Sequence, residues 1–160
     1  MAAVPGRHGE HLRDGGVAVI SSPYVAGVIY STAHALSTVT AAVGDRIYRR
    51  WYSGDEAVYT TPFIIYRHIE PTVDDGPLGG PVATQTHRFE VALYDDGNSF
   101  SNAVMTAISD LDAALQDIDT TISATGWQIT SRQEQEIPDL DIEYGLPYVR
   151  VGGIYAFTVG

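Results

Sequence analysis

The most constraining feature of the sequence is an alternating segment followed directly by an amphipathic one. Thr84–Tyr94 alternates between two sets of side chains, which predicts a strand with two different faces. One face of this strand carries Phe89, Val91 and Leu93, and the other carries Arg88, Glu90 and Tyr94. After a turn at residues 95–98, apolar residues recur every three or four positions, which predicts a long helix. They are Phe100, Val104, Ala107, Ile108, Leu111, Leu115 and Ile118.

A second helix and further strands are expected on either side of this pair. Ser21-Ser22-Pro23 is typical of a helix start, and Gly44 supplies a matching stop. Strands are expected at Ile47–Tyr52, at Phe63–Ile69, from Trp127 onward, and at Tyr148–Val159, the last with a bulge at Gly152-Gly153. This order predicts an α+β fold, in which a four- to five-stranded, mostly antiparallel sheet packs against two amphipathic helices.

The chain of 160 residues fits an N-terminal arm, residues 1–20, followed by one domain, residues 21–160. The segment 2–16 is rich in glycine and has no periodic apolar face, so little of it could be buried. Val17–Ile20 is a short apolar run that could add a strand to a sheet or dock on a neighbour. The arm is therefore expected to be flexible.

Two loops stand out because proline, glycine and acidic residues gather in them. Glu70–Val82 cannot form a regular element, and loops of about a dozen structureless residues are usually functional or disordered. Ile137–Pro147 is expected to be an acidic loop. The candidate contact residues of the first loop are Asp74, Asp75, Gly76, Pro77, Leu78, Gly79 and Gly80, and a second candidate contact is Arg49-Arg50-Trp51-Tyr52.

The charge and the cysteine count exclude several classes of protein. The formal net charge is −11 and every cation is an arginine, so the chain is poorly suited to gripping nucleic acid. Such acidity suits strong brine, and the missing lysine suits a GC-rich genome equally well. Cysteine is absent, which removes disulfides and thiolate metal sites. Without a membrane-length apolar run or a signal-peptide layout, the expectation is a soluble protein made inside the cell.

No catalytic, metal or cofactor site is expected. His8 and His11 could chelate a cation but lie in the arm without a third ligand nearby. His68 and His87 fall on neighbouring expected strands, with acidic residues such as Asp75 between them, which could form an acid–base pair. Ordinary surface histidines explain this spacing better. The sequence also has no nucleophile elbow, P-loop, zincin helix or dinucleotide fingerprint.

Four segments, in order, resemble the tail-terminator (tail-completion) proteins of long-tailed phages. Val43–Tyr48 is similar to the family's hydrophobic-Gly-Asp-Arg-Ile-Tyr signature, and Thr61–Arg67 looks like its Pro-hydrophobic-Tyr strand. Arg88–Tyr94 with the following helix, Ser99–Leu115, is similar to its strand–helix unit. Tyr148–Val159 resembles its closing strand.

The resemblance implies a structural protein of the virion, at the head-proximal end of the tail. Family members form a hexameric ring on the last ring of the tail tube, stop tube growth and face the head-completion (stopper) protein, while DNA passes through. On this reading the protein is a homo-oligomer and not an enzyme. Two alternatives stay open: another neck component, such as a head–tail stopper or adaptor, and a small hydrolase using His68, His87 and Asp75.

Overall fold

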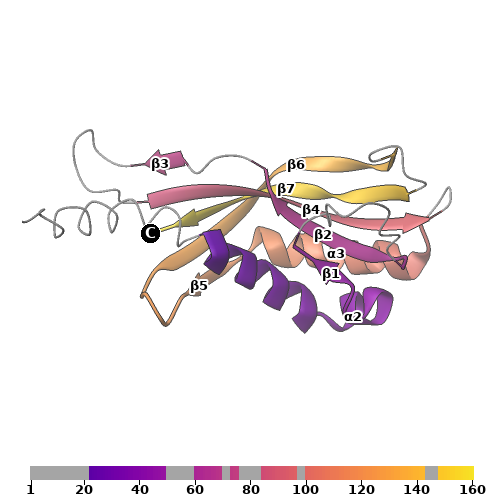
Figure 1. Cartoon of the computed structure of the whole chain (residues 1–160), viewed down its shortest axis with the longest axis horizontal. Coiled ribbons are helices and arrows are strands. Elements are labelled where there is room, and N and C mark those ends of the chain that lie inside the picture. Colours follow the sequence, from indigo (N-terminus) through magenta and orange to yellow (C-terminus); the bar gives the residue numbers. More distant parts are fainter. Residues whose placement is uncertain (1–21, 50–59, 70–72, 76–83, 97–99, 143–147) are drawn as a thin grey trace, which may run out of the picture.

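The computed structural model describes residues 22–49, 60–69, 73–75, 84–96, 100–142 and 148–160. They form two layers, in which the helices cover one face of a long, curled sheet (Figure 1). The predicted arm, residues 1–20, lies outside the described residues. None of the described helices is long and apolar enough to cross a membrane.

The described residues contribute seven strands to the sheet, and its longest pair lies at the centre. The strand order is β1 (Ile47–Tyr48), β2 (Phe63–His68), β4 (Thr84–Asp96), β7 (Tyr148–Val159), β6 (Gln128–Ile142) and β5 (Asp119–Thr121). The seventh strand, β3 (Val73–Asp75), also pairs with β4. All pairs are antiparallel except β1 with β2, which confirms the mostly antiparallel expectation.

The main core lies between the helices and the inner face of the sheet. Phe89, Val91 and Leu93 of β4 point into it, as the alternation predicts, and none is more than 1% exposed. The long helix α3 (Asn102–Gln116) buries the five middle residues of the predicted stripe, whereas Phe100 and Ile118 at its ends lie outside the helix and are half-buried. The N-cap of α3 is Ser101, whose hydroxyl accepts from the Val104 amide at 3.3 Å. A smaller cluster lies on the outer face and consists of Phe63, Ile65, Ala92 and Tyr94.

Within the described residues the helical layer contains three helices, not the predicted two. The expected leading helix is broken at Leu36, which separates the first helix (residues 22–35) from α2 (Ser37–Val43). Leu36 is extended, with φ −84° and ψ 118°. The next residues include the β-branched Thr38, Val39 and Thr40, which favour helix weakly, and the break lets α2 bury Val39 and Val43. Gly44 ends α2 at a positive φ of 60°, as predicted.

Four to five strands was also too few. β3 and β5 are three residues long each, too short for an alternating pattern to show. The acidic loop predicted at 137–147 was wrong over its first half, because β6 continues to Ile142 and pairs with β7. The hydrogen bonds that keep these residues in the sheet are made by the backbone and do not depend on the side chains. An acidic composition was therefore not evidence against a strand.

The bulge predicted at Gly152-Gly153 is on the neighbouring strand instead. The register of β6 with β7 shifts between Gln133 and Gln135 and again between Ile137 and Asp141, whereas β7 pairs with β4 without interruption. The predicted strand Ile47–Tyr52 is described only as β1, and residues 50–59 lie outside the described residues.

Candidate interaction surfaces

The predicted contact loop is partly in the sheet. Asp74 and Asp75 belong to β3, where they pair with Gln85 and Thr84 of β4. The other five predicted residues, Gly76, Pro77, Leu78, Gly79 and Gly80, lie outside the described residues. The predicted loop therefore contains an additional strand, to which Asp74 and Asp75 belong.

The second predicted contact is described at one position only. Arg49 is exposed and follows β1, an edge strand, directly. Arg50, Trp51 and Tyr52 lie outside the described residues.

A charged network lies on the outer face of the sheet, which the helices leave open. Glu90 of β4 accepts from Arg67 of β2 at 3.2 Å and from Arg150 of β7 at 3.0 Å. The side chain of Glu90 is only 9% exposed, and those of Arg67 and Arg150 are 27% and 14% exposed. One shielded carboxylate therefore joins the three central strands through two arginines.

A second ion group extends this network across β6. Arg88 binds Glu134 at 2.5 Å, and Arg132 binds the same carboxylate at 3.2 Å. The hydrogen bond from Arg88, with the smaller effect of Arg132, lowers the pKa of Glu134 below its usual value against the opposing effect of burial. Glu134 lies in the register shift of β6, so the bulge aims this carboxylate at Arg88.

A polar network on the inner face attaches α3 to the sheet. The Tyr155 hydroxyl donates to Asp112 Oδ1 at 2.5 Å, and the Gln133 amide donates to the same oxygen at 3.0 Å. Gln116 donates to Asp112 Oδ2 at 2.6 Å. The close approach depends on Gly153, where a Cβ would lie 3.0 Å from the Tyr155 hydroxyl. Burial first, and then the hydrogen bond to Asp112, raise the pKa of Tyr155 well above its ordinary value of 10.0.

We expect Tyr155→Phe to lower the free energy of unfolding by about 2 kcal/mol at pH 7, because a buried hydrogen bond to a carboxylate is lost. The raised pKa also predicts a pH dependence. The contribution of this tyrosine is fully present below its unfolded pKa near 10 and is lost as the pH rises further. Urea unfolding between pH 7 and 11 measures both effects. Tyr30→Phe, at a residue that is 38% exposed, is the control. If the free energy of unfolding of Tyr155→Phe falls as steeply above pH 10 as that of the unsubstituted protein, Tyr155 is not the source of this pH dependence.

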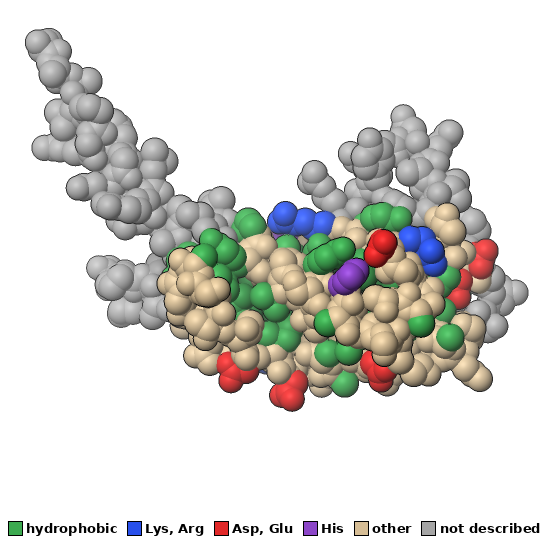
Figure 2. All heavy atoms as spheres, turned by 90° about the horizontal axis from the view of Figure 1, so that it is seen from below, with side chains coloured by type: hydrophobic (Ala, Val, Ile, Leu, Met, Phe, Trp, Pro, Cys, Tyr) green, Lys and Arg blue, Asp and Glu red, His purple; other side chains and the backbone are tan. Residues whose placement is uncertain are grey.

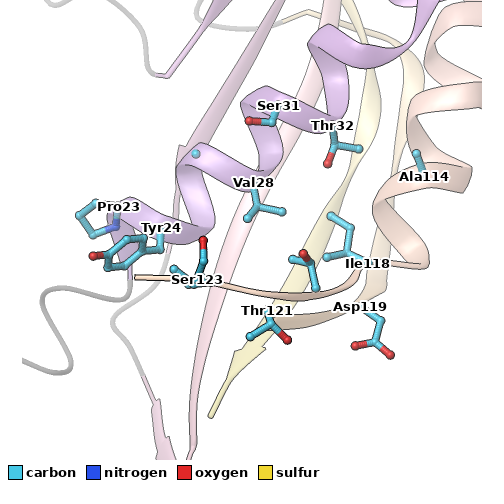
Figure 3. A pocket seen from close by; sticks show the side chains of 13 residues that line it. Pro23, Tyr24, Val28, Ser31, Thr32, Ala114, Ile118, Asp119, Thr121 and Ser123 are labelled. Carbon is cyan, nitrogen blue, oxygen red and sulfur yellow. The ribbon is translucent and has the colours of Figure 1, made fainter. Parts of the chain in front are cut away.

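A groove runs between the first helix and β5, on the helix side of the molecule (Figure 3). Its volume is about 620 Å³. Tyr24 and Val28 of the helix and Ile118 and Ile122 beside β5 line it, and all four are only partly buried against the core. We call it the β5 groove. Seen from below the view of Figure 1, apolar side chains reach the surface in several places, and carboxylates lie along the lower edge, at the right end and beside a histidine (Figure 2).

The histidines considered for catalysis lie side by side, as expected from neighbouring strands. The rings of His68 and His87 are 5.5 Å apart between centroids. His87 is fully buried, so the expectation of an ordinary surface histidine is wrong for it, whereas His68 is exposed as expected. Within the part of the chain that the structure describes, no group of three or more histidines, aspartates or glutamates could hold a metal ion.

Comparison with solved structures identifies the architecture. A chain of the virion of a native gene transfer agent (GTA) particle superposes with a TM-score of 0.61, covering 82% of this chain and 90% of that chain. The two chains share a fold. Their sequence identity is 18%, so the similarity establishes the fold alone. No protein-family model matches the sequence, and no curated protein matches it.

Sequence reasoning missed both the charged network and the β5 groove. The signal for the first was present, because alternation places Arg88 and Glu90 on the outer face. The partners of Glu90, Arg67 and Arg150, lie on β2 and β7, and the sequence does not show that these strands pair with β4 in this register. The groove had no signal, because a three-residue edge strand leaves no pattern in the sequence.

Proposed function

We propose that this protein is a structural, non-enzymatic component of a virion, and that copies of it form a ring, hexameric in the family it resembles, on the end of a tail tube. At the head-proximal end of the tail such a ring ends tube polymerisation and joins the tail to the head-completion protein. DNA passes through it without specific binding.

The observation that carries the proposal is the fold shared with a GTA virion chain over most of both lengths. The order of the four segments that resemble tail terminators supports the finer assignment. A ring of identical subunits needs two different contact surfaces on each copy. The two ends of the described sheet meet this need, since β1 is its outermost strand on one side and β5 on the other. The net charge of −11 also suits a channel that repels DNA.

Electron microscopy of lysates tests this proposal directly. Particles produced without this gene are compared with particles from the same genome complemented with it. Overlong tubes without heads, in the deletion alone, are the expected result, because nothing ends tube growth. Normal-length tails that fail to join heads would instead assign the protein to the stopper position. Intact, infectious particles would contradict any structural role in the virion.

Replacing Asp74–Gly80 with a short Gly-Ser turn is expected to abolish capping, if this loop contacts the tube or the adjacent subunit. Complementation with this variant should then give overlong tubes, as the deletion does. Because the change also removes two residues that pair with β4, circular dichroism and thermal unfolding must show that the fold is kept. A second variant, in which only residues 76–80 are replaced, keeps β3. Normal capping by both variants would exclude the loop as the contact.

A further inference from the structure

We propose that the β5 groove receives the N-terminal segment Val17–Ile20 of a second copy of this chain, which adds to β5 as an extra strand. The inference deepens the proposed ring by naming one contact between its subunits, and it rests on that proposal only for the number of copies. The occupant of the groove is the apolar end of a neighbour's arm.

The backbone of β5 offers open hydrogen-bonding groups to such a strand. Ser131 N donates to Ile118 O at 3.1 Å, and Ile122 N donates to Trp127 O at 2.7 Å. Because antiparallel pairs alternate between bonded and non-bonded positions, Thr120 also faces β6. The amides and carbonyls of Asp119 and Thr121 therefore point the other way, where no strand of the described residues pairs with β5.

The walls of the groove suit apolar side chains. Val28, Ile118 and Ile122 are packed against the core but not covered, so they leave apolar surface at the edge of the sheet. Tyr24 packs edge-on against Trp127, with ring centroids 6.0 Å apart, and closes one end (Figure 3). The residues of β5 are exposed and the groove beside them is lined by apolar side chains, which together favour binding of an added strand. In this mode the main chain of the added strand forms hydrogen bonds with β5, and every second side chain enters the groove.

The N-terminal segment that lies outside the described residues, residues 1–21, immediately precedes residues that line the groove. The first helix starts at residue 22, and its residues Pro23 and Tyr24 line the groove. The run Val17-Ala18-Val19-Ile20 immediately precedes it and is apolar, with three β-branched residues. The charges of residues 1–20 cancel, with two arginines against Glu10 and Asp14, so the arm meets no net repulsion from an acidic neighbour.

A neighbouring copy is favoured over the chain's own arm because of distance along the chain. Only Ser21 separates Ile20 from the first helix, which itself forms a wall of the groove. A residue spans at most about 3.6 Å, so the chain's own strand would have to reverse and cross to β5 within one or two residues. The arm of another copy approaches without this reversal.

Cysteine cross-linking tests the contact cleanly, since the chain has no cysteine of its own. Ala18→Cys is combined in separate versions with Asp119→Cys, Thr120→Cys and Thr121→Cys, which covers the registers that place Ala18 on either face of the sheet. Mild oxidation of the full-length protein should give dimers and larger ladders on non-reducing gels. A differently tagged Ala18→Cys chain co-expressed with a Thr121→Cys chain should give the mixed dimer, at a yield at least tenfold above that of either variant alone.

Two outcomes overturn the proposal. A disulfide within single chains shows that the arm folds back onto its own groove. A yield no higher than that of the single-cysteine chains shows that the groove takes no arm, and leaves it open to another protein. If cross-linking fails but the gene deletion still gives overlong tubes, the capping role stands and the arm exchange alone is wrong. If cross-linking succeeds but the gene deletion gives normal tails, the arm exchange stands and the capping role is wrong.

A matched pair of substitutions at one position supplies a second measurement. Thr121→Pro removes an amide that points away from β6, so it blocks an added strand while sparing the β5–β6 ladder. Thr121→Ala keeps that amide. Light scattering should find the oligomer of the unsubstituted protein in Thr121→Ala and its loss in Thr121→Pro, with both proteins folded by circular dichroism. Equal oligomers in both would overturn the inference.

Discussion

Gly152→Ala is expected to lower the free energy of unfolding by about 3 kcal/mol. A Cβ at this position would lie 2.1 Å from the carbonyl oxygen of Val91 and 2.7 Å from Cα of Ala92. Both atoms belong to the backbone of β4, so no side chain can rotate away to relieve the clash. The longest strand pair of the sheet has to move apart instead. At about 2–4 °C per kcal/mol, the melting temperature should fall by about 6–12 °C.

Gly27→Ala provides the matched control. Gly27 lies in the first helix, and a Cβ there would have no atom within 4 Å. Alanine favours helix over glycine by about 1 kcal/mol, so this variant should unfold at the same or a higher temperature. Thermal unfolding of both variants separates a local clash from a general effect of the added methyl group. Equal stability of Gly152→Ala and the unsubstituted protein would mean that β4 and β7 lie further apart than described.

Glu90→Ala is expected to cost about 3 kcal/mol, for an electrostatic reason. The change removes the carboxylate that pairs with both Arg67 and Arg150. Because these side chains are mostly shielded from solvent, water replaces the lost partner only in part. Glu90→Gln should lose most of the same free energy, since it keeps the shape of the side chain and removes the charge.

Asp45→Ala is the control for a surface ion pair. Asp45 contacts His34 at 3.3 Å, but its side chain is 92% exposed, so its removal should leave the unfolding midpoint unchanged. Urea unfolding at two salt concentrations measures all three variants. If Glu90→Ala loses no more than Asp45→Ala, the outer-face network does not hold the central strands together.

The fold was predictable where one pattern repeats over several turns or several residues. The helix stripe of α3 and the alternation of β4 each repeat often enough to fix the buried side, and both predictions are confirmed. Prediction was wrong where tertiary contacts decide the local structure. β6 continues through an acidic segment because β7 supplies its hydrogen bonds, and the helical layer breaks at Leu36 because Val39 and Val43 then reach the core.

The candidate surfaces were less predictable than the fold. Composition marked the Glu70–Val82 loop, yet it could not show that Asp74 and Asp75 pair with β4. Glu90 reads as one polar residue on a strand, and its role depends on arginines from β2 and β7, 23 and 60 residues away in sequence. The groove arises from the packing of the first helix beside β5, which only the three-dimensional arrangement creates.

The central position of β7 has a consequence for biosynthesis. β4 finds its main partner in a strand that follows much later, and even the nearest pair, Asp96 and Tyr148, is 52 residues apart. A ribosome therefore exposes β4 and α3 well before the strand that completes the sheet emerges. Folding that depends on such distant contacts is slow, and the waiting intermediate presents apolar strands to other nascent chains. Slower synthesis at low temperature and the presence of chaperones should therefore raise the yield of folded protein more than any change to the finished surface.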